Sequence, residues 1–226
     1  MTDADKGNLD QHSEMNKMTA VQKTLLYIFA AFAIIFIAAL PFQTYLGNFV
    51  IKAIPAISLS ALALTTVSGS KGKLLFVSLL FCAAGDVALE LGAGKYFLIG
   101  LGFFLSAQIM FIVTFSRDFK MQRSRIPIIV ILAIYALAIA SIMTPSLKEM
   151  AIPVYFYLTA ITLMGIFAAL RAARNKFTLY GAVSFIISDS IIAINRFMMP
   201  VPAADYIIMV TYYTALFLIV YGFLKE

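Results

Sequence analysis

Long apolar runs, separated by short groups of turn-forming and charged residues, make up most of the chain after residue 23. The runs lie at 24–40, 48–67, 74–91, 96–115, 126–143, 151–170, 177–198 and 205–224. Each comes close to the roughly 20 apolar residues that a helix needs to cross a bilayer. The breaks fall at Pro41 and at 68–72, 92–95, 116–125, 144–146, 171–176 and 200–202. The pattern predicts an all-α membrane protein with eight transmembrane helices, in which short connections make successive helices antiparallel neighbours.

Residues 1–23 form the longest polar stretch, in which four acidic residues mix with three lysines. Such a composition is typical of a flexible extension. It does not resemble the short basic n-region of a signal peptide, so the first apolar run is expected to be an uncleaved span. The sequence therefore predicts a flexible cytoplasmic tail at 1–23 and an eight-helix transmembrane domain at 24–226.

Composition agrees with a membrane location. The chain has 226 residues, of which 62% are hydrophobic and 12% charged, with a mean hydropathy of +0.96. Soluble domains average about 45–50% apolar and about 25% charged residues. We therefore expect an integral membrane protein without a separate aqueous domain.

The distribution of basic residues predicts the orientation. Under the eight-span arrangement, thirteen Lys and Arg residues fall on the side of the two termini and four on the opposite side. The four are Lys52, Lys95, Lys148 and Arg196. The positive-inside rule then places both termini in the cytoplasm. Together with the absence of a targeting sequence, this charge pattern favours the inner (plasma) membrane of a bacterium.

Several classes of function lack the residues that they need. Cys82 and His12 are the single cysteine and histidine, so no metal site of these ligands is expected, and Cys82 is expected to pack as an apolar residue. No glycine-rich phosphate loop or Gly-x-Ser-x-Gly elbow is present, and no organic cofactor is implied. No basic patch interleaved with aromatic residues suggests nucleic acid. The sequence leaves the oligomeric state open.

Two aspartates, Asp86 and Asp189, stand inside predicted spans. An acid at the centre of a membrane helix costs about 2.5–3.5 kcal/mol on insertion scales, so such residues usually face a protein interior or a wet cavity and serve a function. Asp86 follows Lys73 by thirteen residues, and Asp189 follows Lys176 by thirteen. Because both spans run in the same direction, the two carboxyls are expected at the same depth, about 20 Å from the cytoplasmic end.

A pair of buried carboxyls suits acid–base chemistry. Burial disfavours the ionised form, and a second nearby carboxyl does so further, which allows one protonated acid beside one ionised base. That pairing fits acid-catalysed cleavage of an ether-type bond through an oxocarbenium-like state. A site within the membrane points to a lipid substrate. The alternative is a pair of structural acids that hydrogen-bond across helices.

Other polar residues in the spans are candidates for substrate binding. They are Lys52, Gln108, Tyr157, Ser188, Tyr212 and Tyr213. Lys52 can reach the headgroup region or bind a lipid phosphate, and Gln108 needs a hydrogen-bond partner inside the protein. The tyrosines are typical either of an interfacial belt or of a cavity wall. Glu90, on the same helix face as Asp86, and Asn195 with Arg196 are expected at the interface.

The sequence around the aspartates resembles the YhhN family of membrane proteins, whose animal members are lysoplasmalogenases. The resemblance rests on Gly85-Asp86 with Phe97-x-x-Gly100-x-x-Phe103, and on Gly181-Ala182-x-x-Phe185-x-x-Ser188-Asp189-Ser190-x-x-Ala193. Pieces at 211–213 and 218–219 also fit. The family has an eight-span fold.

This resemblance implies a reaction, a substrate and site residues. The family hydrolyses the vinyl ether bond of lysoplasmalogens to a fatty aldehyde and a glycerophospho-ethanolamine or -choline, and its aspartates match Asp86 and Asp189. One would donate the proton and the other would activate water; the more apolar surroundings of Asp189 favour it as the donor. The chain departs from the family pattern at Gln108, where a histidine is common, at Leu216, where a glutamine is common, and at 52–55, where a Lys-Pro-x-Pro motif is common. These departures are compatible with another lysolipid or ether as substrate.

Two other functions remain open from the sequence alone. A proton-coupled small-molecule transporter would use a buried aspartate as its proton carrier. A non-catalytic lipid-binding membrane protein would keep both aspartates for structure. The expected partners are membrane lipids and a lysophospholipid or ether lipid, without nucleic acid.

Overall fold

The computed structural model describes residues 18–42, 47–92 and 94–226, and this part of the chain is helical. Its α-helices are α2 (Ala20–Ala39), α3 (Asn48–Thr66), α4 (Gly69–Glu90), α5 (Phe97–Ser116), α6 (Ile126–Leu147), α7 (Ala151–Ala169), α8 (Phe177–Phe197) and α9 (Ala204–Leu224). Short 3-10 helices are η1 (Leu40–Phe42), η2 (Arg123–Arg125) and η3 (Lys148–Met150). Within the described ranges, β-structure is limited to one isolated bridge, between Phe119 and Arg171.

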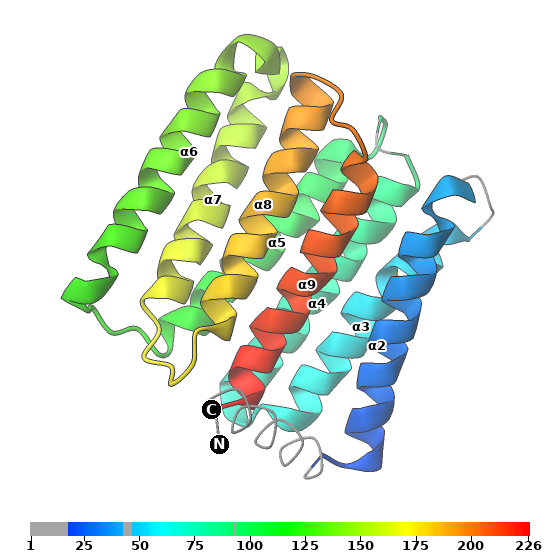
Figure 1. Ribbon diagram of the computed structural model, residues 1–226, viewed down its shortest axis with the longest axis vertical. Coiled ribbons are helices and arrows are strands. Elements are labelled where there is room, and N and C mark those ends of the chain that lie inside the picture. The colour runs from blue at the N-terminus through cyan, green and yellow to red at the C-terminus, as the bar shows by residue number, and fades with distance from the viewer. Residues whose placement is uncertain (1–17, 43–46, 93) are drawn as a thin grey trace, which may run out of the picture.

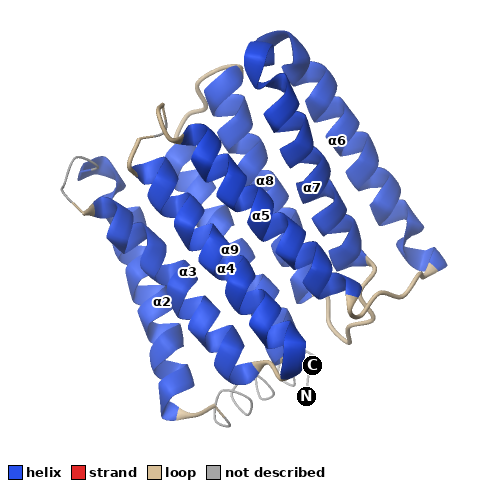
Figure 2. Cartoon of the chain, turned by 180° about the vertical axis from the view of Figure 1, so that it is seen from behind, coloured by secondary structure: helices blue, strands red, loops and turns tan. Residues whose placement is uncertain are grey.

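The helices form a bundle of two layers. Figure 1 shows α8 and α9 in front of α5 and α4, and Figure 2 shows the same layers from behind, with α4 and α5 nearer the viewer. Helix α3 continues the second layer and contacts α9, while α2 covers one edge. Helices α6 and α7 form the opposite edge, with α7 against α5 and α8. This arrangement encloses one continuous apolar core between α4 and α5 on one side and α8 and α9 on the other.

The fold is that of an integral membrane protein, as predicted. Seven stretches of the described chain are long and apolar enough to cross a membrane. One of them, Arg123–Ala169, has 47 residues and contains α6, η3 and α7. Large apolar side chains of α6, among them Ile131, Ile134 and Leu137, are exposed on the bundle surface, where lipid would cover them.

The first helix begins earlier than its apolar run suggested. The Thr19 side chain accepts a hydrogen bond from the backbone N–H of Gln22, and the Gln22 side chain accepts one from the backbone N–H of Thr19. This reciprocal capping box starts α2 at Ala20, four residues before the predicted start of the span. The end of the predicted tail is therefore helical, while residues 1–17 lie outside the described residues.

The segment 68–72, predicted as a break, contains the first residues of α4. Helix α3 ends at Thr66, and α4 begins at Gly69 after a turn of two residues. Gly72 permits this tight turn, since a Cβ at that position would lie 2.0 Å from the carbonyl oxygen of Val67. Gly72 therefore allows α4 to pack closely against the backbone at the end of α3, and it does not end a helix.

The segment 144–146 was also wrongly predicted as a break. Helix α6 continues through Pro145 to Leu147. The chain reverses at Lys148, which has a positive φ of 47°. Because Pro145 lies in the last turn of the helix, the reversal follows it by only a few residues.

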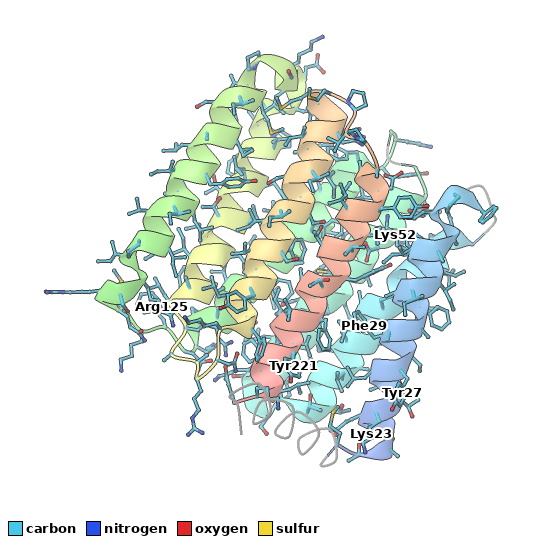
Figure 3. All side chains as sticks on the ribbon, in the orientation of Figure 1. Lys23, Tyr27, Phe29, Lys52, Arg125 and Tyr221 are labelled. Carbon is cyan, nitrogen blue, oxygen red and sulfur yellow. The ribbon has the colours of Figure 1, made fainter. Side chains whose placement is uncertain are left out.

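The bundle has two ends, named here after one residue at each. At the Glu90 end, α2, α4, α6 and α8 finish and α3, α5, α7 and α9 begin; the Asp118 end is the opposite one. Figure 3 shows Lys52 toward the Glu90 end and Lys23 and Tyr221 toward the Asp118 end. The start of α2 and the end of α9 thus lie at the same end of the bundle (Figure 1).

A network of charged side chains closes the Asp118 end. The Arg171 side chain is only 1% exposed, and its Nη2 contacts Asp118 Oδ2 at 3.1 Å and Glu226 Oε1, while its Nη1 donates to Thr178 Oγ1. Lys71 Nζ contacts Asp118 Oδ1 at 2.5 Å. The guanidinium also lies 3.6 Å from the ring centroid of Phe223. These contacts join the loop after α5, the start of α4, the loop after α7 and the C-terminus.

The electrostatic state of Asp118 reflects this network. Burial alone raises the pKa of the carboxyl, but hydrogen bonds and charges from Lys71 and Arg171 outweigh burial. The pKa of Asp118 therefore lies below its ordinary value of 3.8. The ionised carboxylate holds the two cations together at neutral pH.

Candidate active site

The two aspartates come from opposite layers of the bundle. Asp86 lies on α4, one turn before the Glu90 end, and is only 2% exposed. The Tyr212 hydroxyl of α9 donates to Asp86 Oδ2 at 2.7 Å. A tyrosine that was expected either in a belt or in a cavity wall is therefore a direct partner of a candidate catalytic carboxyl.

Asp189, on α8, has an equivalent partner from a different helix. The Tyr157 hydroxyl of α7 donates to Asp189 Oδ2. Gln108 of α5 extends this chain, because its Nε2 donates to the Tyr157 oxygen at 3.4 Å. The Gln108 side chain is completely buried, and its Oε1 has no hydrogen-bond partner among the described residues. Three helices thus fix the orientation of one carboxyl.

The two carboxyls are linked through Phe104. This residue lines the apolar cavity with Asp189, and its ring centroid lies 5.9 Å from that of Tyr212, the partner of Asp86. Cys82 lies one turn before Asp86 on α4. The Cys82 side chain is completely buried. No hydrogen bond joins the two carboxyls directly within the described chain, so each is oriented by its own tyrosine.

Aromatic rings fill the space between the two layers. Phe104 of α5 contacts Phe185 of α8 and Tyr212 of α9, with ring centroids 6.4 Å and 5.9 Å away. The ring reaches this position because residue 85 is glycine: a Cβ there would lie 2.6 Å from the Phe104 ring. The glycine before Asp86 therefore allows an apolar, water-excluding wall beside the carboxyls.

Two cavities lie at the Glu90 end of the site. The apolar cavity has a volume of about 50 Å³ and is lined by Leu89, Phe97, Leu101, Phe104, Val154, Tyr157, Asp189, Ile192, Ala193 and Phe197. The mouth cavity has a volume of about 440 Å³ and is lined by Phe36, Leu40, Asn48, Lys52, Leu89, Glu90, Phe97, Ile192, Asn195, Arg196, Asp205, Ile208 and Met209. Leu89, Phe97 and Ile192 belong to both walls. Asp189 therefore faces an apolar space that adjoins a larger polar one.

Lys52 lies in the mouth cavity, where it is held by an acid. Its Nζ contacts Glu90 Oε2 at 2.9 Å, and Asn48 Nδ2 donates to Glu90 Oε1 at 2.5 Å. The Tyr213 hydroxyl donates to the backbone carbonyl of Lys52 at 3.0 Å. Glu90, expected at the interface, is thus a partner of Lys52 and part of the cavity wall.

Six positions that the sequence singled out line neither cavity: Asp86, Gln108, Ser188, Tyr212, Tyr213 and Leu216. Ser188 is completely buried, and its hydroxyl donates to the carbonyl of Ile208 at 3.1 Å, which joins α8 to α9. Leu216, at the position of the family's glutamine, is completely buried in the core.

Sequence reasoning did not select five polar residues of the mouth cavity as site residues: Asn48, Glu90, Asn195, Arg196 and Asp205. A usable signal existed for Glu90, which is four residues after Asp86 and so shares its helix face. Asn195 and Arg196 similarly follow Asp189 by six and seven residues along α8. No pattern in the sequence distinguished Asp205 from an ordinary helix-start residue.

Fold and site together define a helical membrane protein with two tyrosine-bound carboxyls, of which Asp86 is buried and Asp189 lines an apolar cavity. The chain belongs to the YhhN family, whose model matches residues 47–223. The resemblance read from the sequence motifs is thereby confirmed.

Relatives with assigned names agree with this membership. The chain is 32% identical over 178 residues to a lysoplasmalogenase of Mycobacterium bovis, covering 76% of this chain and 68% of the relative. It is 33% identical over 157 residues to lysoplasmalogenase TMEM86A of Homo sapiens, covering 64% of this chain and 62% of the relative. Human lysoplasmalogenase TMEM86B is 29% identical over 182 residues, covering 78% and 75%. No solved structure gives a significant match to the chain.

Proposed function

We propose that this chain is a membrane hydrolase of the lysoplasmalogenase type. It cleaves the vinyl ether bond of a lysoplasmalogen and yields a fatty aldehyde and a glycerophospho-ethanolamine or -choline. The observation that carries this proposal is the Asp189 carboxyl, held by Tyr157 at the wall of an apolar cavity. Membership of the YhhN family and the names of the relatives support the same reaction.

The chemistry needs one proton donor and one activated water. Protonation of the β-carbon of the vinyl ether gives an oxocarbenium ion at the carbon bonded to oxygen. Water adds to that carbon and loses a proton, and the resulting hemiacetal collapses to the aldehyde and the free glycerol hydroxyl. After water addition the acid has lost its proton and the base carries one. Collapse of the hemiacetal restores both, because the base gives its proton to the departing glycerol oxygen and the ionised acid takes the proton of the hemiacetal hydroxyl. General acid–base catalysis of this kind contributes typically about 10²–10⁴-fold in rate.

We assign the acid to Asp189 and the base to Asp86. Asp189 lines the apolar cavity, where the vinyl ether carbons would lie, and apolar surroundings favour a neutral carboxyl. Asp86 is the other carboxyl of the site, and Tyr212 donates to its Oδ2, so its Oδ1 is left to accept the proton of the attacking water. The bond from Tyr157 engages Oδ2 of Asp189, which leaves Oδ1 for proton transfer to the substrate.

The two tyrosines act as positioning residues in this scheme. Tyr157 and Tyr212 each fix one carboxylate oxygen, and the chain from Gln108 fixes Tyr157. Gln108 cannot titrate, so its part in the proposed reaction is to orient Tyr157 and not to transfer a proton.

We propose further that α2 to α9 are eight separate spans with the Asp118 end in the cytoplasm of a bacterium. Helices α6 and α7 are distinct, with a reversal at Lys148 between them, and each has about the length that a bilayer requires. The basic residues concentrate at the Asp118 end. Because the single cysteine is buried, cysteines introduced at Lys148 and Lys225 report orientation. In intact cells a membrane-impermeant thiol reagent should label position 148 and not 225, and the reverse result would overturn the topology.

The activity is tested with purified protein in lipid nanodiscs. The protein is incubated with a vinyl ether lysolipid and, separately, with the saturated ether and the acyl ester of the same chain and headgroup, and products are followed by mass spectrometry. We expect aldehyde from the vinyl ether alone, since only an enol ether forms an oxocarbenium ion on carbon protonation. Lysolipid that remains bound but unchanged would favour a non-catalytic lipid-binding protein. Accumulation of unchanged substrate in vesicles, driven by a pH gradient, would favour a transporter.

A further inference from the structure

Two residues of opposite charge in the wall of the mouth cavity, Arg196 and Asp205, form no ion pair with any residue that the structure describes. We propose that this cavity is the headgroup site, in which Arg196 binds the phosphate and Asp205 the ammonium of a zwitterionic lysolipid. The inference deepens the proposed function and rests on it, because it names the residues that select the substrate of the same site. The volume of about 440 Å³ falls within the roughly 300–1,000 Å³ that is common for small-molecule sites.

Of the four charged residues in the wall of the mouth cavity, two form an ion pair with each other and the other two form none with a described residue. Lys52 and Glu90 contact each other at 2.9 Å, so their charges are largely neutralised locally. Arg196, on α8, and Asp205, on α9, make no ion pair within the described part of the chain. A ligand with one negative and one positive group complements these two, whereas a ligand with a single charge leaves one of them without a partner.

The Arg196 guanidinium lies over an aromatic ring. Its Cζ lies 3.8 Å from the ring centroid of Phe97. Stacking on a ring occupies the face of a guanidinium and leaves its N–H edges available, and these edges match two oxygens of a phosphate. The stack therefore prepares Arg196 for an oxyanion.

Phe97 also connects the headgroup site to the carboxyl that is proposed to act on the lipid. With Leu89 and Ile192, it forms the wall common to the mouth cavity and the apolar cavity. Asp189 and Arg196 are seven residues apart on α8, so they share a face and are separated by about 10 Å along the helix axis. In a lysoplasmalogen, seven bonds separate the protonated carbon from phosphorus, on the order of 9 Å when extended. One lipid can therefore contact both side chains.

Headgroup selection follows from Asp205. A lysolipid that ends in phosphate alone leaves Asp205 without a cation and adds a negative charge beside it and Glu90. A lysolipid with an ethanolamine or choline group neutralises Asp205. The site should therefore prefer the zwitterion to the phosphate monoester.

The test compares two variants on three vinyl ether substrates with one fatty chain: the phosphoethanolamine lysolipid, the phosphate monoester and the headgroup-free alkenylglycerol. Arg196→Gln is expected to lower kcat/KM on both phosphate-bearing substrates by about ten- to a hundredfold, the range of one lost charged hydrogen bond, and Arg196→Lys to recover part of it. Asp205→Asn is expected to lower kcat/KM on the phosphoethanolamine substrate alone. Rates on alkenylglycerol should stay within about twofold of the wild-type rate in all variants.

Lys148→Gln and Glu149→Gln are the matched controls, because both residues are exposed at the same end and lie outside the cavity wall. An equal fall on all three substrates, or no fall on any, would overturn the headgroup site. If the wild-type protein releases no aldehyde from any substrate, the proposed reaction fails, and the headgroup site is then judged from binding of the saturated ether lysolipid. Equal affinity of that lipid for the wild type, Arg196→Gln and Asp205→Asn would overturn the site independently of catalysis.

Discussion

The two ends of the bundle hold similar sets of charged residues in different arrangements. At the Asp118 end, Arg171 is enclosed by Asp118, Glu226, Thr178 and the ring of Phe223. At the Glu90 end, the charges line a cavity of about 440 Å³, which shares Leu89, Phe97 and Ile192 with the apolar cavity that Asp189 lines. Charges that satisfy one another hold helices and loops together. Charges that line a cavity remain available to a ligand.

The two ends also show two different uses of an ionisable residue that is removed from water. A buried ion network is maintained by mutual contacts, and loss of one member leaves an uncompensated charge. Asp86 and Asp189 instead accept hydrogen bonds from neutral tyrosines, and no cation within the described ranges forms an ion pair with either. The first arrangement accounts for stability, and the second is suited to a group that exchanges a proton.

Arg171→Met should give the largest effect on stability. The variant leaves Asp118 and Glu226 without their shared cation, which costs about 3–5 kcal/mol for a buried pair. We expect a lower thermal midpoint in nanodiscs, with aldehyde release per folded molecule unchanged. Arg174→Met, in the same loop but exposed, is the matched control and should leave the midpoint unaltered. An unchanged midpoint for Arg171→Met would show that the network does not stabilise the bundle.

Tyr157→Phe should act on the reaction and not on the fold. Asp189 becomes a carboxylate as it donates its proton, and a hydrogen bond to a charged group contributes about 1.5–3 kcal/mol. Loss of the bond from Tyr157 is therefore expected to lower kcat by about ten- to a hundredfold with little change in KM. Tyr135→Phe is the control, since the Tyr135 hydroxyl donates to Ser190 Oγ at 2.8 Å, next to Asp189 on the same helix. Equal kcat values for the two variants would remove Tyr157 from the scheme.

The smallest effect should be the acid sensitivity of the Asp118 end. Because the pKa of Asp118 is lower in the folded protein than in the unfolded chain, its contribution to stability is present above its ordinary value of 3.8. That contribution is lost as the pH falls through the lower, folded-state pKa. Thermal midpoints measured between neutral pH and pH values below 3.8 should therefore fall further for the wild type than for Asp118→Asn. Parallel curves for the two proteins would contradict this role of the carboxylate.

The helical fold could be predicted because lipid-facing and core-facing positions are both apolar, so that each helix appears as one long run. The helix boundaries near 68–72 and 144–146 could not be predicted. Gly72 and Pro145 are residues that commonly end helices, and whether they do so here depends on contacts with the rest of the fold. The start of α2 was within reach of the sequence, because Thr19 and Gln22 have the spacing of a capping box.

Prediction of the site succeeded where a residue is unusual in its own context and failed where its role depends on a distant partner. Asp86 and Asp189 stood out as acids in apolar runs. The partner of each carboxyl is 126 or 32 residues away in the chain, and only helix packing brings Tyr212 and Tyr157 to them. In the sequence, Arg171 likewise looked like an ordinary charged residue of a loop, because its partners Asp118 and Glu226 are 53 and 55 residues away.

The most direct test of the account is the rate of aldehyde release from a vinyl ether lysolipid by Asp86→Asn and Asp189→Asn, each compared with the wild type at equal folded fraction. The substitutions keep the size of the side chain and remove its ability to carry a proton. The account predicts that each variant loses activity by at least about a hundredfold, while Asp118→Asn retains the wild-type rate per folded molecule. A wild-type rate in either Asp86→Asn or Asp189→Asn would contradict the proposed two-carboxyl mechanism.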